Sequence, residues 1–141
     1  MDLDSARLED VQAWLRKAEL DLRVAEHLLS PSRPGLEADV VFHAQQAAEK
    51  ALKAFLTLHD VAFRKTHSLE ELGRKCQAIE PSLAGLVDQA APLTEYAWKF
   101  RYPGEPEEPT RHEAEEALAT ARRVYEAILR RMPPEVPHRS A

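Results

Sequence analysis

The sequence is poor in the residues that build covalent frameworks and flexible loops. It has one cysteine, Cys76, and only four glycines among 141 residues. A single cysteine excludes a disulfide framework and a cysteine-rich zinc site within the chain. Because Cys76 falls at an apolar position of a helical pattern, we expect a buried, unreactive thiol rather than a reactive one.

Long apolar runs are also missing. No segment approaches the roughly 18 consecutive apolar residues of a transmembrane helix. The first ten residues, MDLDSARLED, lack the apolar stretch of a signal peptide. Together with the single cysteine, these absences lead us to expect a cytoplasmic protein that does not contact a membrane.

Familiar motifs for metal and nucleotide chemistry are absent as well. The six histidines show no HExxH spacing, and there is neither a glycine-rich phosphate loop nor a GxSxG turn. We therefore expect no metal site and no cofactor. The formal net charge of −5 argues against non-specific binding to duplex nucleic acid, although it leaves room for a local basic site.

Helical periodicity is what the sequence has in abundance. In five segments apolar residues recur in steps of three and four, with charged residues between them. The first two stripes are Leu8, Val11, Leu15, Ala18, Leu22, Ala25 and Leu29, and Val41, Ala44, Ala48, Ala51, Phe55 and Leu58. Ser68 with Glu71, and Thr110 with Glu113, have the spacing of capping boxes and predict two helix starts. The second segment is also apolar off its stripe, so we expect it to be the most buried helix.

Amphipathic helices of this kind can bury their stripes only against one another. Short connections favour antiparallel neighbours, which predicts an all-α, up-and-down bundle of four long helices and one short one. The fourth long helix is expected over residues 83–100, with a kink at Pro92. We expect a single domain over residues 1–132 and a flexible proline-rich tail over residues 133–141. Excess apolar surface on the long helices favours a homodimer.

Three blocks of the sequence resemble motifs of the HEPN family. Residues 42–54, FHAQQAAEKALKA, resemble the signature helix of that family. Residues 64–69, RKTHSL, resemble its link into the third helix, and residues 101–103, RYP, resemble the motif that closes its fourth helix. The order and spacing of the blocks fit over roughly residues 8–131, so the resemblance implies the helical-bundle fold of the family.

The resemblance also implies a dimer, a partner and an activity. Many HEPN proteins are encoded beside a minimal nucleotidyltransferase and act with it as a toxin–antitoxin pair. Many are metal-independent endoribonucleases that use an arginine and a later histidine with four to six residues between them. Arg101 aligns with that arginine, but Pro106, Glu107 and Glu108 stand where the histidine is expected, and the next histidine is His112. The sequence therefore lacks the usual ribonuclease motif of the family and does not favour that activity.

Arg101 and the aromatic residues around it form the first candidate site. At a helix C-terminus Arg101 has two interpretations: it stabilises the helix dipole, or it binds a phosphate bidentately beside Tyr102. For Trp98 and Phe100 we expect core packing, with stacking on nucleic-acid bases as the alternative.

Two basic groups form the other candidate sites. His43, Lys50 and Lys53 share one polar side of the second helix. This side is either solvated or lines a groove in which the lysines hold phosphates and His43 transfers a proton. Arg64 and His67 lie in a basic turn that either carries incidental surface charge or binds phosphate at a helix N-terminus.

Two functions from different classes fit these observations. In the first, the chain binds a nucleotidyltransferase, and a nucleotide or RNA, without cleaving anything; the missing histidine and the acidic balance favour this function. In the second, it is an endoribonuclease toxin in which Arg101 stabilises the phosphate transition state, and His112 or His43 is the acid and base. The sequence leaves open whether the partner modifies Tyr102.

Overall fold

The structure, a computed structural model, describes residues 3–31, 34–104 and 107–136, and within these ranges all regular structure is helical. The elements are α1 (Ser5–Leu28), α2 (Glu37–Leu58), α3 (Leu69–Ile79), the 3-10 turn η1 (Pro81–Leu83), α4 (Ala84–Ala90), the 3-10 segment η2 (Ala91–Ala97) and α5 (Arg111–Leu129). The predicted all-α bundle is confirmed. No helix in the described ranges is long and apolar enough to cross a bilayer.

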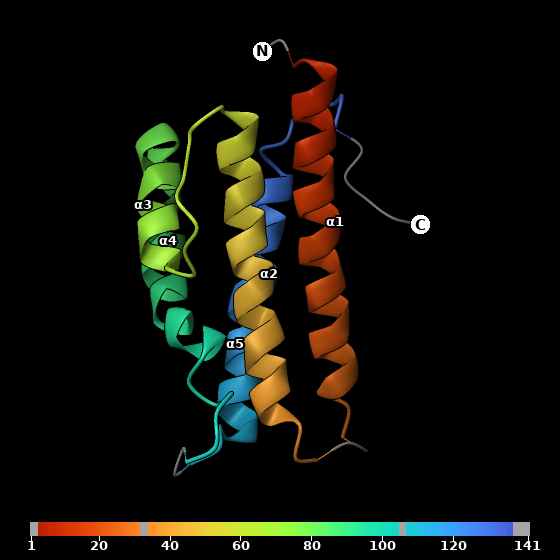
Figure 1. Cartoon of the computed structure of the whole chain (residues 1–141), viewed down its shortest axis with the longest axis vertical. Coiled ribbons are helices and arrows are strands. Elements are labelled where there is room, and N and C mark those ends of the chain that lie inside the picture. The colour runs from red at the N-terminus through yellow and green to blue at the C-terminus, as the bar shows by residue number, and fades with distance from the viewer. Residues whose placement is uncertain (1–2, 32–33, 105–106, 137–141) are drawn as a thin grey trace.

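Helix α2 is the centre of the bundle. Helices α1 and α5 pack along it, while α3 and α4 lie on its other side (Figure 1). Most of its 22 residues are buried, which confirms the expectation that it is the most buried helix. Its many alanines leave little side chain between the backbones, so α1 and α5 pack closely against it.

The direction of α3 differs from the predicted up-and-down order. The connection of residues 59–68 runs back along α2 before α3 begins, so α3 runs in the same direction as α2 (Figure 1). Gln45 near the start of α2 donates to the His67 carbonyl, and Cys76 in α3 lies 3.6 Å from the Leu52 carbonyl. The expectation of antiparallel neighbours fails here because the connection is long enough to return.

The fourth segment also differs from the helix expected over residues 83–100. It consists of the seven-residue α4 followed by the 3-10 segment η2, which ends at Ala97. Pro92 lies in the first turn of η2. Because proline has no N–H and its ring clashes with the preceding turn, the α-helix stops here instead of bending and continuing.

The chain remains packed beyond the end of α5. Val136 is fully buried in the core, and its N–H donates to the Pro133 carbonyl at 3.0 Å. The tail expected over residues 133–141 is therefore ordered as far as residue 136, and residues 137–141 lie outside the described residues.

The two predicted capping boxes have different outcomes. At α5 both bonds are present: Thr110 caps the Glu113 N–H, and the Glu113 carboxylate accepts from the Thr110 N–H. At α3 only the first bond forms, from the Glu71 N–H to the Ser68 hydroxyl. The Glu71 carboxylate accepts instead from Arg64, which ties the connection to the first turn of α3.

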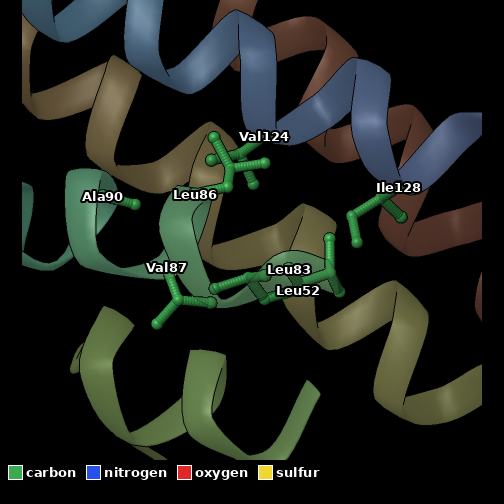
Figure 2. A pocket seen from close by; sticks show the side chains of 7 residues that line it. All are labelled: Leu52, Leu83, Leu86, Val87, Ala90, Val124 and Ile128. Atoms are coloured by element: carbon green, nitrogen blue, oxygen red, sulfur yellow. The ribbon is translucent and has the colours of Figure 1, made fainter. Parts of the chain in front are cut away.

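The apolar side chains of α2, α4 and α5 leave a small gap between them (Figure 2). Its volume is about 10 Å³, and its lining, including Leu52, Leu86 and Val124, exposes no polar surface. A water molecule there would find no hydrogen-bonding partner, so the gap stays dry.

Cys76 is buried in the core, as expected. Burial raises the pKa of its thiol to about 12, so the thiol remains protonated and unreactive.

Candidate functional site

Polar side chains occupy one side of the otherwise apolar helix α2. We call this set the α2 polar face: His43, Gln45, Gln46, Glu49, Lys50 and Lys53. The spacing of three and four residues places these side chains on one side of the helix. That side lies between α1 and the returning connection of residues 59–68 (Figure 1). The polar face therefore lines a partly covered site rather than a fully solvated surface.

Asp21 of α1 joins two members of this face. Its carboxylate accepts from the His43 Nδ1 at 2.8 Å and from the Lys50 ammonium at 2.6 Å. Asp21 is buried, whereas the side chains of His43 and Lys50 keep partial access to solvent. A carboxylate on Nδ1 fixes the orientation of the imidazole and leaves Nε2 as the nitrogen that can meet a ligand.

Glu49 is the centre of a second, more deeply buried group. Its carboxylate accepts from the Lys53 ammonium at 2.8 Å, from the His67 Nδ1 at 2.8 Å and from the Gln45 amide at 3.1 Å. Gln45 also donates to the His67 carbonyl. The hydrogen bonds of Glu49 and Gln45 therefore hold the connection of residues 59–68 against α2.

Lys53 is enclosed by this group. Its ammonium lies 5.4 Å from the ring centre of Trp14 and 5.8 Å from that of Phe63, and its side chain is only 9% exposed. The pairing of Glu49 with Lys53, which the i, i+4 spacing allows, is present. Lys53 thus holds α1 and the connection against α2 and does not present its charge to solvent.

Arg101 reaches the beginning of α2 from the end of the fourth segment. Its guanidinium carbon lies 3.9 Å from the centre of the Phe42 ring, and its Nη1 lies 3.2 Å from the Asp39 carboxylate. The Phe42 ring in turn meets the His43 ring edge-on, with centroids 5.2 Å apart. Arg101 and His43 therefore both contact the Phe42 ring, and the Arg101 side chain is 39% exposed.

The remaining candidates lie apart from this end of α2 or are already engaged. Arg64 forms a bidentate pair with Glu71, and its guanidinium lowers the pKa of the Glu71 carboxyl. His112 lies on the first turn of α5, highly exposed and 3.6 Å from Glu116. Tyr102 is exposed next to Arg101. Of the two histidines considered for catalysis, His43 is the one that contacts the ring on which Arg101 lies.

The core role expected for Trp98 is wrong, because its side chain is 49% exposed. Phe100, for which the same role was expected, is packed against the core. Phe100 lies on a stripe with Leu93 and Ala97, three and four residues apart, whereas Trp98 lies off that stripe and was expected in the core for its apolar ring alone.

The sequence did not indicate the pairings of three carboxylates in the site. Asp21 and Asp39 were not considered as partners of any residue, and Glu49 was not considered as a partner of His67. For Asp21 a signal was available. It lies beside Ala18, Leu22 and Ala25 on the apolar stripe of α1, and a charge at such a position requires a buried partner. No group of three or more histidine, cysteine or acidic residues in the described ranges is arranged to hold a metal ion.

Comparison with known proteins agrees with this architecture. The model of the HEPN domain family matches residues 11–132. A Methanocaldococcus jannaschii protein named "Putative toxin MJ1304" is 33% identical over 144 residues, covering 91% of each chain. The crystal structure of an archaeal HEPN homologue is similar with a TM-score of 0.69 and 27% identity, covering 86% of this chain and 96% of that one. The fold is that of a HEPN helical bundle, and the chain belongs to the HEPN domain family.

Proposed function

We propose that this protein is the HEPN half of a toxin–antitoxin-like pair and binds a nucleotide or RNA at the α2 polar face without cleaving it. A minimal nucleotidyltransferase is its proposed protein partner. Support for the toxin-like role comes from membership of the HEPN family and from the relative that carries the name of a toxin. Support for the partner comes from the family resemblance alone.

The link between Arg101 and His43 through the Phe42 ring, and between His43 and Lys50 through Asp21, carries the ligand part of the proposal. Guanidinium, imidazole and ammonium groups are donors that suit phosphate oxygens. Each has a fixed position, because Asp39 and Phe42 hold Arg101, while Asp21 holds both His43 and Lys50. A phosphate that binds here replaces Asp39 or Asp21 as the partner of these cations. The cations are already held in place before the phosphate arrives.

A second candidate function, metal-independent ribonuclease, is favoured by the Asp21–His43 pair. A carboxylate that fixes Nδ1 of an imidazole leaves Nε2 free to accept or donate a proton during cleavage of a phosphodiester. Arg101, across the Phe42 ring, is placed to stabilise the charge that develops on the phosphate. The absence of a histidine at the usual spacing after Arg101 is the reason for ranking this function second.

The two functions are separated by one set of variants assayed for binding and cleavage in EDTA. The set is the wild type, Arg101→Ala, His43→Ala and a matched control, Arg16→Ala, which removes an exposed arginine of α1. A labelled RNA reports binding by fluorescence anisotropy and cleavage by gel electrophoresis. We expect binding without cleavage, weakened by roughly tenfold or more in Arg101→Ala, because a charge-assisted bond is lost.

Cleavage by the wild type that disappears in Arg101→Ala and His43→Ala would establish the second function. If the wild type binds neither RNA nor nucleotides, the ligand part of the first function is wrong.

The protein partner is tested by co-expressing this chain with a nucleotidyltransferase encoded beside its gene and analysing the mixture by size-exclusion chromatography. Separate elution of the two proteins would contradict it.

A further inference from the structure

Aromatic side chains alternate between core and surface in residues 96–102. Tyr96 and Phe100 are half-buried against the core and stack on each other, with centroids 6.0 Å apart and an interplanar angle of 26°. Trp98 and Tyr102 are 49% and 70% exposed. Tyr96 and Phe100 thus hold the segment against the core. Trp98 and Tyr102 lie at the surface, one before and one after Arg101 in the sequence.

The exposed pair is unusual within the described residues. Only four large hydrophobic side chains are exposed there: Leu20 and Val24 on α1, and Trp98 and Tyr102 here. Tryptophan is highly buried on average, because its large apolar surface is costly to leave in water. A tryptophan and a tyrosine exposed within one short segment are therefore candidates for contact with a ligand.

The segment is held in place although its aromatic rings are exposed. The Arg101 N–H donates to the Trp98 carbonyl at 3.0 Å, and the Lys99 N–H donates to the Glu95 carbonyl at 2.8 Å. The Lys99 ammonium also pairs with the Glu95 carboxylate and lies 5.3 Å from the centre of the Phe100 ring. A fixed backbone lowers the entropy lost when a ligand orders the exposed rings.

We propose that Trp98 and Tyr102 form a stacking site for unpaired bases of a single-stranded RNA whose phosphate binds Arg101. This inference rests on the proposed function and adds the base-recognising residues and the form of the RNA. Unpaired bases present π faces to aromatic side chains, whereas bases inside a duplex are covered by their neighbours.

Charge favours nucleic acid over a protein partner for this surface. Lys99 and Arg101 alternate with the outward aromatic residues, and Arg101 connects the segment to Phe42 and the α2 polar face. Alternating cations and aromatic rings match the alternation of phosphates and bases along a strand. A protein interface of this size would instead have an apolar centre depleted of charged residues.

The test uses the fluorescence of Trp98. The chain has two tryptophans, so Trp14→Phe leaves Trp98 as the only one. We expect single-stranded oligoadenylate to quench this fluorescence at the concentrations where anisotropy shows binding, and a duplex of the same length to leave it unchanged. In the wild-type background Trp98→Ala and Tyr102→Ala should each weaken binding by about 5- to 100-fold, following the known contribution of base stacking.

Matched variants separate stacking from a general loss of structure. Trp98→Phe should recover most of the affinity lost in Trp98→Ala, because a phenyl ring still stacks. Leu20→Ala removes an exposed apolar side chain from α1 and should bind as the wild type does. Circular dichroism shows whether each variant remains folded.

The outcomes distinguish this inference from the proposed function. If Arg101→Ala binds weakly while Trp98→Ala and Tyr102→Ala bind like the wild type, the stacking site is wrong and the proposed function stands. If the wild type binds a nucleotide but no single-stranded RNA, the inference fails and the proposed function stands. If it binds neither RNA nor a nucleotide, both fail. If Trp98→Ala instead breaks a complex with a second copy or with the nucleotidyltransferase, and RNA binding is unchanged, the surface is a protein interface and the inference is overturned.

Discussion

The α2 polar face and the segment of residues 91–104 both contribute to the candidate site, but they are built in opposite ways. On α2, buried carboxylates hold every charged side chain that faces α1 or the connection. In residues 91–104 the half-buried Tyr96 and Phe100 support a backbone whose other aromatic side chains are exposed. In the first region the same residues therefore hold the fold and would bind the proposed ligand, whereas in the second the two roles fall to alternate residues.

This difference predicts where substitutions affect stability and where they affect only binding. Removing a carboxylate that pairs with the α2 polar face leaves a buried or half-buried charge without its partner. Removing an outward side chain from residues 91–104 leaves the core unchanged. Four tests, ordered by the larger effect on stability expected in each, examine this difference.

Glu49→Ala should have the largest effect. It leaves the Lys53 ammonium buried without a carboxylate and frees His67 from α2. We expect a loss of about 3–5 kcal/mol in the free energy of unfolding, measured by urea denaturation. The double variant Glu49→Gln with Lys53→Met removes both charges and should recover much of the loss. Unchanged stability in Glu49→Ala would show that the pair does not hold the connection.

Phe100→Ala should cost roughly 2 kcal/mol, about half the value for a fully buried phenylalanine, because the ring is half-buried. Trp98→Ala, two residues away, should remain within about 0.5 kcal/mol of the wild type because its ring is exposed. Equal losses in the two variants, measured by urea denaturation, would remove the distinction between inward and outward residues.

Asp21→Ala should cost about 1–3 kcal/mol, since it leaves His43 and Lys50 without their shared acceptor. The effect is smaller than for Glu49 because both partners can reach water when the carboxylate is gone. Asp10→Ala, an exposed acid on the same helix, is the control and should be close to neutral. A neutral Asp21→Ala in the same assay would mean that the site does not depend on this pair.

Arg101→Ala should have a small effect on stability, below about 1 kcal/mol, because its pair with Asp39 is partly exposed. The same variant should lose affinity for RNA, as measured by anisotropy. A large loss of stability would assign Arg101 a structural role at the end of the fourth segment and would weaken the case for a ligand.

Prediction from sequence was most successful where structure follows from local spacing. Leu15, Ala48 and Phe55 lie on the predicted stripes, and all three are buried. A helix with apolar residues three and four apart has one side that must leave water, whatever it packs against. Trp98 lies off the stripe that ends at Phe100, so no spacing supported the burial expected for it, and it is exposed.

Close packing between helices was not visible in the sequence. Gly73 looks like a weak position in α3, yet a Cβ there would lie 2.6 Å from the Val87 Cγ1. The glycine is needed because α3 and α4 approach each other closely at this point. Nothing in the neighbouring residues of the chain indicates that approach.

The sequence by itself determined the helices, their buried sides and the polar residues on α2, because these follow from contacts between residues a few positions apart. The tertiary structure decided the site. Asp21 meets His43 and Lys50 across 22 and 29 residues, and Arg101 meets Asp39 across 62. Such pairs depend on where the helices lie against one another and on the connection that returns along α2, which local spacing does not specify.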